Sequence, residues 1–172
     1  MHPIPTFFLL KRQTYVRSLL KNSLVLDMGC NKYKVVPSSI GLDLEKESKP
    51  DVLSTCLKTP FPDNSFDTVT ALELIEHFDS RDQDRFLDEV YRILKRKGQF
   101  IVSTPNISEA TRKLHDFLFF VSHMVYARQD VHAHIGELTH HQLKRKLLNA
   151  RFKICSEKAF SIFNYVVNCE KP

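Results

Sequence analysis

Two aspartates follow short apolar runs, each at the point where a β-strand is expected to end. Asp27 closes the run 24–26, and Asp43 closes the run 39–42. Gly29 follows Asp27 by two positions and permits a tight turn that a side chain would obstruct. Carboxylates at strand ends accept hydrogen bonds from ribose hydroxyls in doubly wound folds. The pair of aspartates therefore predicts a nucleoside site.

The loop that leaves Gly29 carries two unusual positions. Asn31 tolerates a left-handed backbone better than most residues, whereas Tyr33 does not allow a ligand to approach the backbone as a glycine would. Residues 34–40 then lead directly to the next apolar segment. A parallel crossover generally needs a dozen or more residues, so we expect a compressed crossing with no full helix.

Strands and helices that would position these residues alternate along the chain. Strands are predicted at 24–27, 39–43, 51–53, 66–72 and 99–104, and two final antiparallel strands at 152–156 and 160–167. Helices are predicted at 7–21, from the cap at 79–80 to the basic run 95–97 before Gly98, and from the cap Thr139 onward. The first helix, within a segment 1–22, has two interpretations: packing at the sheet edge or a lid over a ligand.

Five ordered blocks carry a resemblance to a known family. They are 25–30 (VLDMGC), 41–43 (GLD), 60–67 (PFPDNSFD), 73–77 (ELIEH) and 94–98 (LKRKG). In this order they resemble the class I S-adenosylmethionine-dependent methyltransferases, and among these the small type 11 group. The resemblance covers roughly residues 22–106, whereas the last third is only loosely similar.

The resemblance implies both a fold and a cofactor. The implied fold is α/β, a doubly wound and mostly parallel sheet in a single domain over 1–172, with a shortened first crossover and a helical insert after the fifth strand. The implied cofactor is S-adenosylmethionine. The residues that the resemblance places near it are Asp27, Gly29, Cys30, Asn31, Asp43, Leu44, Thr55, Cys56, Leu72 and Glu73. Thr55 stands where family members often have an aspartate for adenine.

The methyl acceptor is not identified by any motif. His77, Asn106 and His134 are the candidate substrate contacts, although His77 could equally tie down its loop. The insert at 107–138 could form a substrate wall for an apolar or aromatic small molecule, or its phenylalanine-rich stretch 108–129 could be a core helix or a homodimer helix. Because a sulfonium methyl group is already activated, alignment of the acceptor suffices, and no catalytic residue is named.

Histidines gather between 132 and 141, near Glu137. They could be surface or capping residues, a general base or a metal site, but no cysteine or carboxylate signature accompanies them, so no metal is predicted.

Composition fits a soluble cytoplasmic protein. The chain has 172 residues, a net charge of +5 and no apolar run of transmembrane length. Its four cysteines have neither CxxC nor zinc-ligand spacing, which indicates reduced thiols. The basic residues are scattered, so we do not expect a nucleic-acid partner, although the short clusters 95–97 and 144–146 leave that interpretation open.

Two alternatives to methyl transfer are open. One is a non-catalytic binding or scaffold protein that keeps the fold but has lost the cofactor through Asn31, Tyr33 and the short crossover. The other is a nicotinamide-dependent oxidoreductase, against which the missing dinucleotide glycine loop argues.

Overall fold

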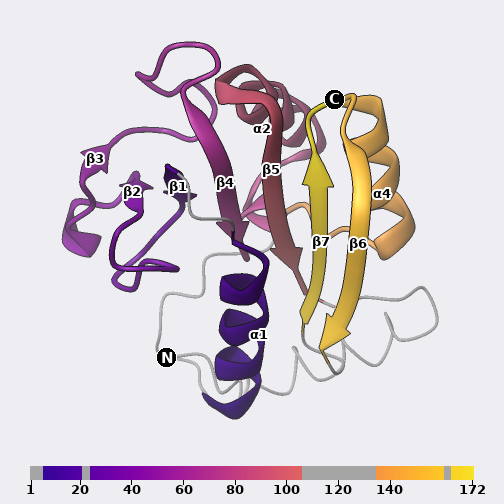
Figure 1. Cartoon of the computed structure of the whole chain (residues 1–172), viewed down its shortest axis with the longest axis horizontal. Coiled ribbons are helices and arrows are strands. Elements are labelled where there is room, and N and C mark those ends of the chain that lie inside the picture. Colours follow the sequence, from indigo (N-terminus) through magenta and orange to yellow (C-terminus); the bar gives the residue numbers. More distant parts are fainter. Residues whose placement is uncertain (1–5, 21–23, 106–134, 161–163) are drawn as a thin grey trace.

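The described residues are built around one seven-stranded sheet (Figure 1). The structure, a computed structural model, describes residues 6–20, 24–105, 135–160 and 164–172. The strand order is β3-β2-β1-β4-β5-β7-β6. All neighbouring strands from β3 to β5 pair in parallel, and β7 is antiparallel to both β5 and β6. The predicted doubly wound, mostly parallel sheet is therefore confirmed.

The strands lie close to their predicted positions. The five parallel strands are β1 (Val25–Met28), β2 (Ile40–Asp43), β3 (Val52–Leu53), β4 (Phe66–Leu72) and β5 (Leu94–Thr104). The final pair is β6 (Lys153–Phe160) and β7 (Asn164–Glu170). No helix separates β1 from β2, as the short spacing predicts. The chain order reverses between β1 and β4, which makes the carboxyl ends of these two strands the topological switch point.

Helices cover both faces of the sheet. The helices α2 (Ser80–Ile93) and α4 (His140–Asn149) pack on the face that holds the main apolar core, which includes Phe86, Leu143 and Phe100. Asp79 caps α2 through the backbone N–H of Asp82, and Thr139 caps α4 with a capping box, both as predicted. Two short 3-10 turns, η1 (Lys46–Ser48) and η2 (Ile75–His77), follow β2 and β4.

The N-terminal helix α1 (Thr6–Leu19) packs on the opposite face of the sheet, where its Tyr15 also contacts Phe160 of the edge strand β6. Its Val16 is fully buried in a second apolar cluster with Val25, Ile101 and Val166, which come from β1, β5 and β7. Figure 1 shows α1 beside the carboxyl ends of β4 and β5. The helix therefore lies next to the edge of the sheet where ligands bind in this architecture.

One predicted boundary is wrong. The basic run 95–97 does not end α2, because α2 ends at Ile93 and the run belongs to β5. Leu94 is fully buried and pairs with Phe66, so the chain enters the sheet at once. The register then shifts before Thr68 pairs with Gln99, and the basic residues occupy this irregular stretch.

Some predictions lie outside the described residues. These are most of the insert 107–138, with its proposed dimer helix 108–129, and the ends of the segment 1–22. Among the helices that the structure describes, none is long and apolar enough to cross a membrane.

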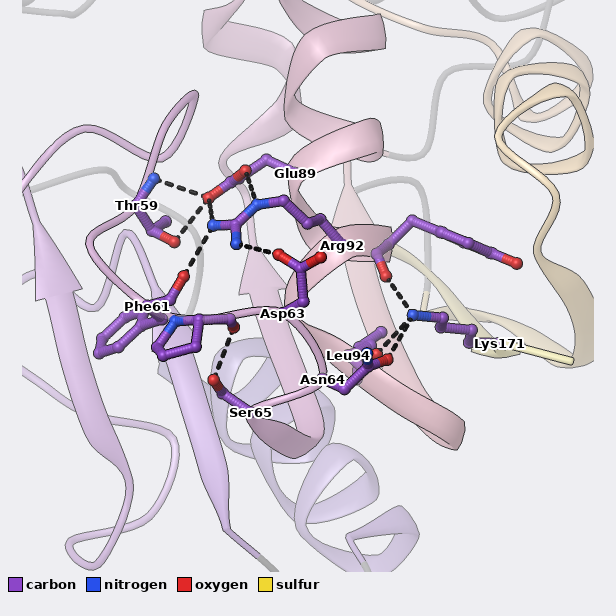
Figure 2. A network of polar contacts seen from close by, with 11 residues as sticks. Thr59, Phe61, Asp63, Asn64, Ser65, Glu89, Arg92, Leu94 and Lys171 are labelled. Carbon is purple, nitrogen blue, oxygen red and sulfur yellow. Dashed lines mark hydrogen bonds and ion pairs between the residues drawn. The ribbon is translucent and has the colours of Figure 1, made fainter.

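A polar network fixes the end of α2 to the strands at the edge opposite the switch point (Figure 2). Glu89 accepts hydrogen bonds from the Thr59 backbone and hydroxyl at 2.7 and 2.6 Å and from the Arg92 guanidinium. Arg92 also donates to Asp63 at 2.7 Å. Lys171 donates to three oxygens, those of the Leu94 and Tyr91 carbonyls and the Asn64 amide. The network therefore holds α2 against the start of β4 and the end of β7.

Candidate cofactor and acceptor site

The Gly29 loop begins the site at the carboxyl end of β1. Gly29 has φ +68°, and its N–H donates to the Leu42 carbonyl at 2.8 Å. A Cβ at this position would lie 2.8 Å from Cδ1 of Leu74, so the absence of a side chain lets Leu74 lie against the loop. Asn31 has φ 46° and adopts the left-handed conformation that its residue type predicts.

Asp27 is buried and holds the loop. Its Oδ1 accepts a hydrogen bond from the Thr70 hydroxyl at 2.6 Å, and its Oδ2 accepts from the Val35 backbone N–H at 2.7 Å. Burial raises its pKa, and these hydrogen bonds partly offset that effect. The structure thus shows Asp27 as a residue that positions the crossing between β1 and β2.

A second carboxylate makes the short crossing feasible. Asp51 accepts from the Gly41 backbone N–H at 2.7 Å and from Lys34 Nζ at 2.8 Å, and Lys34 also donates to the Ser39 carbonyl. Gly41 has no Cβ, which would otherwise lie 2.8 Å from the Cys30 sulfur and 2.9 Å from Lys34 Cδ. The crossing is therefore held by side chains in place of a helix.

Asp43 lies at the carboxyl end of β2, beside the Gly29 loop. Its Oδ2 accepts from the Asn31 backbone N–H at 2.8 Å and its Oδ1 from the Glu45 backbone N–H at 2.9 Å. Each oxygen of a carboxylate can accept a second hydrogen bond, so the group keeps capacity for hydroxyls of a ligand. Leu44 is 72% exposed and Tyr33 is 81% exposed, so both side chains lie largely in solvent. An open carboxylate with an uncovered apolar neighbour suits a nucleoside.

Two cysteines adjoin the same loop. Burial raises the pKa of the Cys30 thiol to about 11, and it raises that of Cys56 to about 12. The charges of Asp27 and Asp43 act on Cys30 in the same direction, and Asp43 acts on both thiols. Both cysteines are therefore protonated packing residues next to the site. Thr55, which precedes Cys56, is exposed and accepts from the backbone N–H of Leu57.

The carboxyl ends of β4 and β5 carry a charged cluster on the α1 side. Glu73 Oε1 lies 3.1 Å from Nη1 of Arg12 and accepts from the Ser103 hydroxyl at 2.7 Å. The side chains of Arg12 and Glu73 are 8% and 22% exposed. The Asn164 amide lies near the Glu73 carboxylate, but outside standard hydrogen-bond geometry. Burial raises the pKa of Glu73, and Arg12 opposes this shift.

Glu76 lies on η2, three residues beyond Glu73, and is fully buried. Neither of its carboxylate oxygens has a hydrogen-bond partner in the described part of the chain. Burial, and next the charge of Glu73, raise its pKa well above the usual range. The Thr104 hydroxyl at the end of β5 is likewise buried without a partner among the described residues. The carboxyl ends of β4 and β5 thus carry buried polar groups that the described residues leave unsatisfied.

Gln83 joins η2 to the segment that follows the insert. Its Nε2 donates to the carbonyls of Gly136 at 2.6 Å and Phe78 at 3.1 Å, and the Gly136 N–H donates to the Glu76 carbonyl at 3.0 Å. The insert therefore leaves the sheet just after Thr104 and returns at the turn that bears Glu76.

The predicted site residues fall into two groups. Gly29, Cys30, Asn31, Asp43 and Cys56 lie together around the β1 loop, whereas Leu72 and Glu73 lie at the end of β4 with Leu72 packed toward α1. His77 is the last residue of η2, and Asn106 and His134 lie outside the described residues. A hollow between α2 and the segment that follows β3 is lined by Leu57, Lys58, Arg85, Asp88, Glu89 and Arg92.

The histidine cluster is only partly described. His140 stacks on Tyr165 with ring centroids 3.8 Å apart, and burial lowers its pKa. No group of three metal-ligating side chains occurs within the described ranges.

Sequence reasoning missed the residues that surround Glu73. Arg12, Ser103 and Asn164 come from α1, β5 and β7, and no local pattern connects them with the end of β4. Glu76 had a signal in the Glu-His pair at 76–77, but its complete burial depends on tertiary packing.

The described residues fit S-adenosylmethionine. The half-buried turn at Gly29 offers backbone groups to a ligand, the Asp43 carboxylate keeps acceptor capacity for hydroxyls, and the exposed Leu44 offers an apolar surface. Tyr33 points into solvent, so the position that departs from the family's glycine pattern leaves this surface open.

Comparison with known proteins identifies the same family. The family described as a methyltransferase domain matches residues 22–102. An uncharacterised protein of Methanocaldococcus jannaschii is 32% identical over 114 residues, which are 58% of this chain and 49% of that protein. A "probable S-adenosylmethionine-dependent methyltransferase" of Mycolicibacterium smegmatis is 32% identical over 99 residues, which are 48% of this chain and 38% of that protein. The chain thus spans about half or less of the length of these relatives.

The fold has close structural counterparts. A crystal structure from Thermotoga maritima, described as a "SAM-dependent methyltransferase, possible histamine N-methyltransferase", covers 95% of this chain and 89% of its own with a TM-score of 0.71 and 21% identity. At that identity the likeness concerns the fold. Residues 22–102 thus match the methyltransferase-domain family, and the described residues have the fold of the class I S-adenosylmethionine-dependent methyltransferases.

Proposed function

We propose that this chain binds S-adenosylmethionine at the carboxyl edge of β1 and β2 and transfers its methyl group to an acceptor held at the ends of β4 and β5. The observation that carries the proposal is the open arrangement of Gly29 and Asp43 across the short crossing, with Tyr33 turned into solvent. Similarity to the probable methyltransferase of Mycolicibacterium smegmatis supports the same activity.

The roles of the residues follow from their positions. Asp43 would accept hydrogen bonds from the two ribose hydroxyls while its backbone bonds to Asn31 and Glu45 keep the carboxylate oriented. The Gly29 loop would lie against the amino-acid part, and Leu44 would pack on the base. Asp27 does not touch the cofactor in this scheme but keeps the loop in place through Val35.

When bound, S-adenosylmethionine supplies a methyl group on a positively charged sulfur, so the protein does not need to activate it. The chain has to hold an acceptor lone pair in line with the methyl group and exclude water. Leu74, which contacts Gly29 and is followed by η2, links the cofactor side to the acceptor side. The acceptor is an unidentified molecule, and its chemical class is taken up below.

Calorimetric titration with S-adenosylhomocysteine tests cofactor binding directly. We expect one site per chain, and a thermal midpoint that rises with ligand concentration because the ligand binds the folded state. Conversion of S-adenosylmethionine to S-adenosylhomocysteine in the presence of acceptor candidates tests transfer. No heat of binding at high protein concentration would instead support a scaffold protein that retains the fold without the cofactor.

A further inference from the structure

The acidic groups at the end of β4 outnumber the cation that faces them. Glu73 and Glu76 lie close enough for the charge of one to affect the pKa of the other, and Arg12 is the cation of the ion pair with Glu73. The Glu137 charge acts on Glu76 in the same unfavourable direction. Buried carboxylates need a cation or a proton as partner. With both glutamates ionised, the described residues leave the cluster at least one positive charge short.

The oxygens of Glu76 are among the buried polar atoms of the described residues that lack a hydrogen-bond partner, as are Nε and Nη1 of Arg12. Glu76 is fully buried, and both of its carboxylate oxygens, together with the Thr104 hydroxyl, have no hydrogen-bond partner in the part of the chain that the structure describes. Unsatisfied buried polar groups are costly and uncommon in folded proteins. Their occurrence at the carboxyl edge, next to the partly exposed Glu73, points to a ligand group that completes them.

The position of this cluster relative to the cofactor residues matches an acceptor site. Leu74, between the two glutamates in sequence, lies against the Gly29 loop, so the cluster adjoins the predicted cofactor crevice on its β4 side. The Gly136 and Glu76 backbones pair at the same turn, which brings the chain that follows the insert to the cluster as well.

We propose that Glu73 and Glu76 form a cation subsite that takes the amino group of the methyl acceptor, so that the enzyme methylates an amine nitrogen. The inference rests on the proposed methyltransferase function and names its substrate class. An ammonium or amine group supplies both the donors that the Glu76 oxygens lack and the positive charge that the cluster lacks. A carboxylate or phenolate acceptor would add a third negative charge beside the two glutamates.

The movement of charge during methyl transfer also favours an amine as the acceptor. The lone pair of a neutral amine forms the new N–C bond, the C–S bond breaks with its electron pair going to sulfur, and the positive charge passes to the methylated nitrogen. That charge develops beside Glu73 and Glu76, which stabilises it. Before transfer, an alkylammonium has to lose one proton to expose its lone pair, and that proton leaves to solvent.

Amine binding should therefore release protons, and this release can be measured without methyl transfer. In the free chain, burial and the charges of Glu73 and Glu137 raise the pKa of Glu76 and favour its protonated form, whereas Arg12 acts in the opposite direction. A protonated amine that joins a protonated Glu76 brings one proton more than the pair can keep. Binding should release about one proton, whichever partner retains the other.

The experiment uses matched ligands and the full chain saturated with S-adenosylhomocysteine. Calorimetry compares sets of an amine, an alcohol and a carboxylate on the same carbon skeleton, such as benzylamine, benzyl alcohol and benzoate, together with aliphatic sets. We expect the amine to bind best in at least one set, with a heat that depends on the ionisation enthalpy of the buffer. Glu76→Gln should weaken amine binding about tenfold or more and abolish the buffer dependence, and in turnover with the preferred amine it should lower kcat about 100-fold.

Two controls make the outcome specific. Glu170→Gln removes one negative charge at the opposite edge, where Glu170 pairs with Gln99 across the ladder, and should leave amine binding unchanged. Glu76→Gln should still bind S-adenosylhomocysteine, so loss of amine binding differs from loss of cofactor binding. No preference for amines, a preference for the carboxylates, or binding of none of the sets would overturn the proposal. A metal site is the competing outcome. If no amine is preferred and Mg²⁺ stabilises the wild-type chain but not Glu76→Gln, the two glutamates bind a metal and the proposal is overturned.

Discussion

Replacement of Asp43 tests the cofactor side of the site most directly. The carboxylate already holds the Asn31 and Glu45 N–H groups, and we expect it to accept two ribose hydroxyls as well. Hydrogen bonds to a charged group contribute about 1.5–3 kcal/mol each, so Asp43→Ala should cost about 3 kcal/mol or more in binding. Because 1.4 kcal/mol is a factor of ten, the dissociation constant for S-adenosylhomocysteine should rise at least about 100-fold.

The asparagine variant refines the same prediction. Asp43→Asn keeps one acceptor oxygen, so we expect a smaller loss of about 1.5–3 kcal/mol, measured by the same calorimetric titration. Asp51→Asn is the matched control, since it also removes a carboxylate that accepts a backbone N–H at this crossing but lies beside Lys34 and Gly41. Wild-type affinity in Asp43→Ala, or an equal loss in Asp51→Asn, would refute the assignment of Asp43 to the ribose.

Three further substitutions probe contacts that stabilise the fold. Gly29→Ala should lower the free energy of unfolding by about 1–2 kcal/mol, because φ is +68° and the new Cβ would push Leu74 aside. Differential scanning fluorimetry should show a lower thermal midpoint, and an unchanged midpoint would contradict the backbone strain. Arg12→Met leaves Glu73 without its cation and should cost about 3 kcal/mol in urea unfolding, so wild-type stability would show that α1 is not held by this ion pair. Glu89→Gln should cost about 2 kcal/mol at neutral pH. Burial raises the pKa of Glu89, but hydrogen bonds from its arginine and threonine partners outweigh burial and hold the pKa below its usual range. The contribution of Glu89 to stability is therefore full above the pKa that this residue has in the unfolded chain, and it is lost as the pH falls through its pKa in the folded chain. Urea unfolding curves of wild type and Glu89→Gln should converge in acid, and curves that diverge there would contradict this sign.

The strand ends were predictable because their signals are local. The apolar runs before Asp27 and Asp43 have strand length, and the glycine at 29 marks the turn that follows. The conformation of Asn31 also followed from its residue type. Each of these inferences depends on neighbours within a few residues, and that is why the strand ends and the turn after β1 could be located from the sequence.

The end of α2 was not predictable from the same kind of signal. A basic run after an amphipathic segment is typical of a helix C-terminus, but Leu94 is buried by pairing with Phe66 and draws the chain into β5 before the run begins. Similarly, the ion pair of Arg12 with Glu73 depends on how α1 packs across the sheet through Val16. Both outcomes depend on contacts between distant residues, which residue type and periodicity do not encode.

The altered glycine pattern after β1 is compatible with a cofactor loop because other residues now fix the backbone. A loop with three glycines reaches its shape through conformational freedom, which it loses on folding. Here Asp27 fixes the loop at Val35, and Asp51 fixes the start of β2 at Gly41 while it holds Lys34. Both carboxylates hold backbone N–H groups of the crossing, and the Tyr33 side chain that stands at a glycine position of the family is exposed. Asp27 should therefore be as important for the shape of the site as Asp43 is for contact with the ligand.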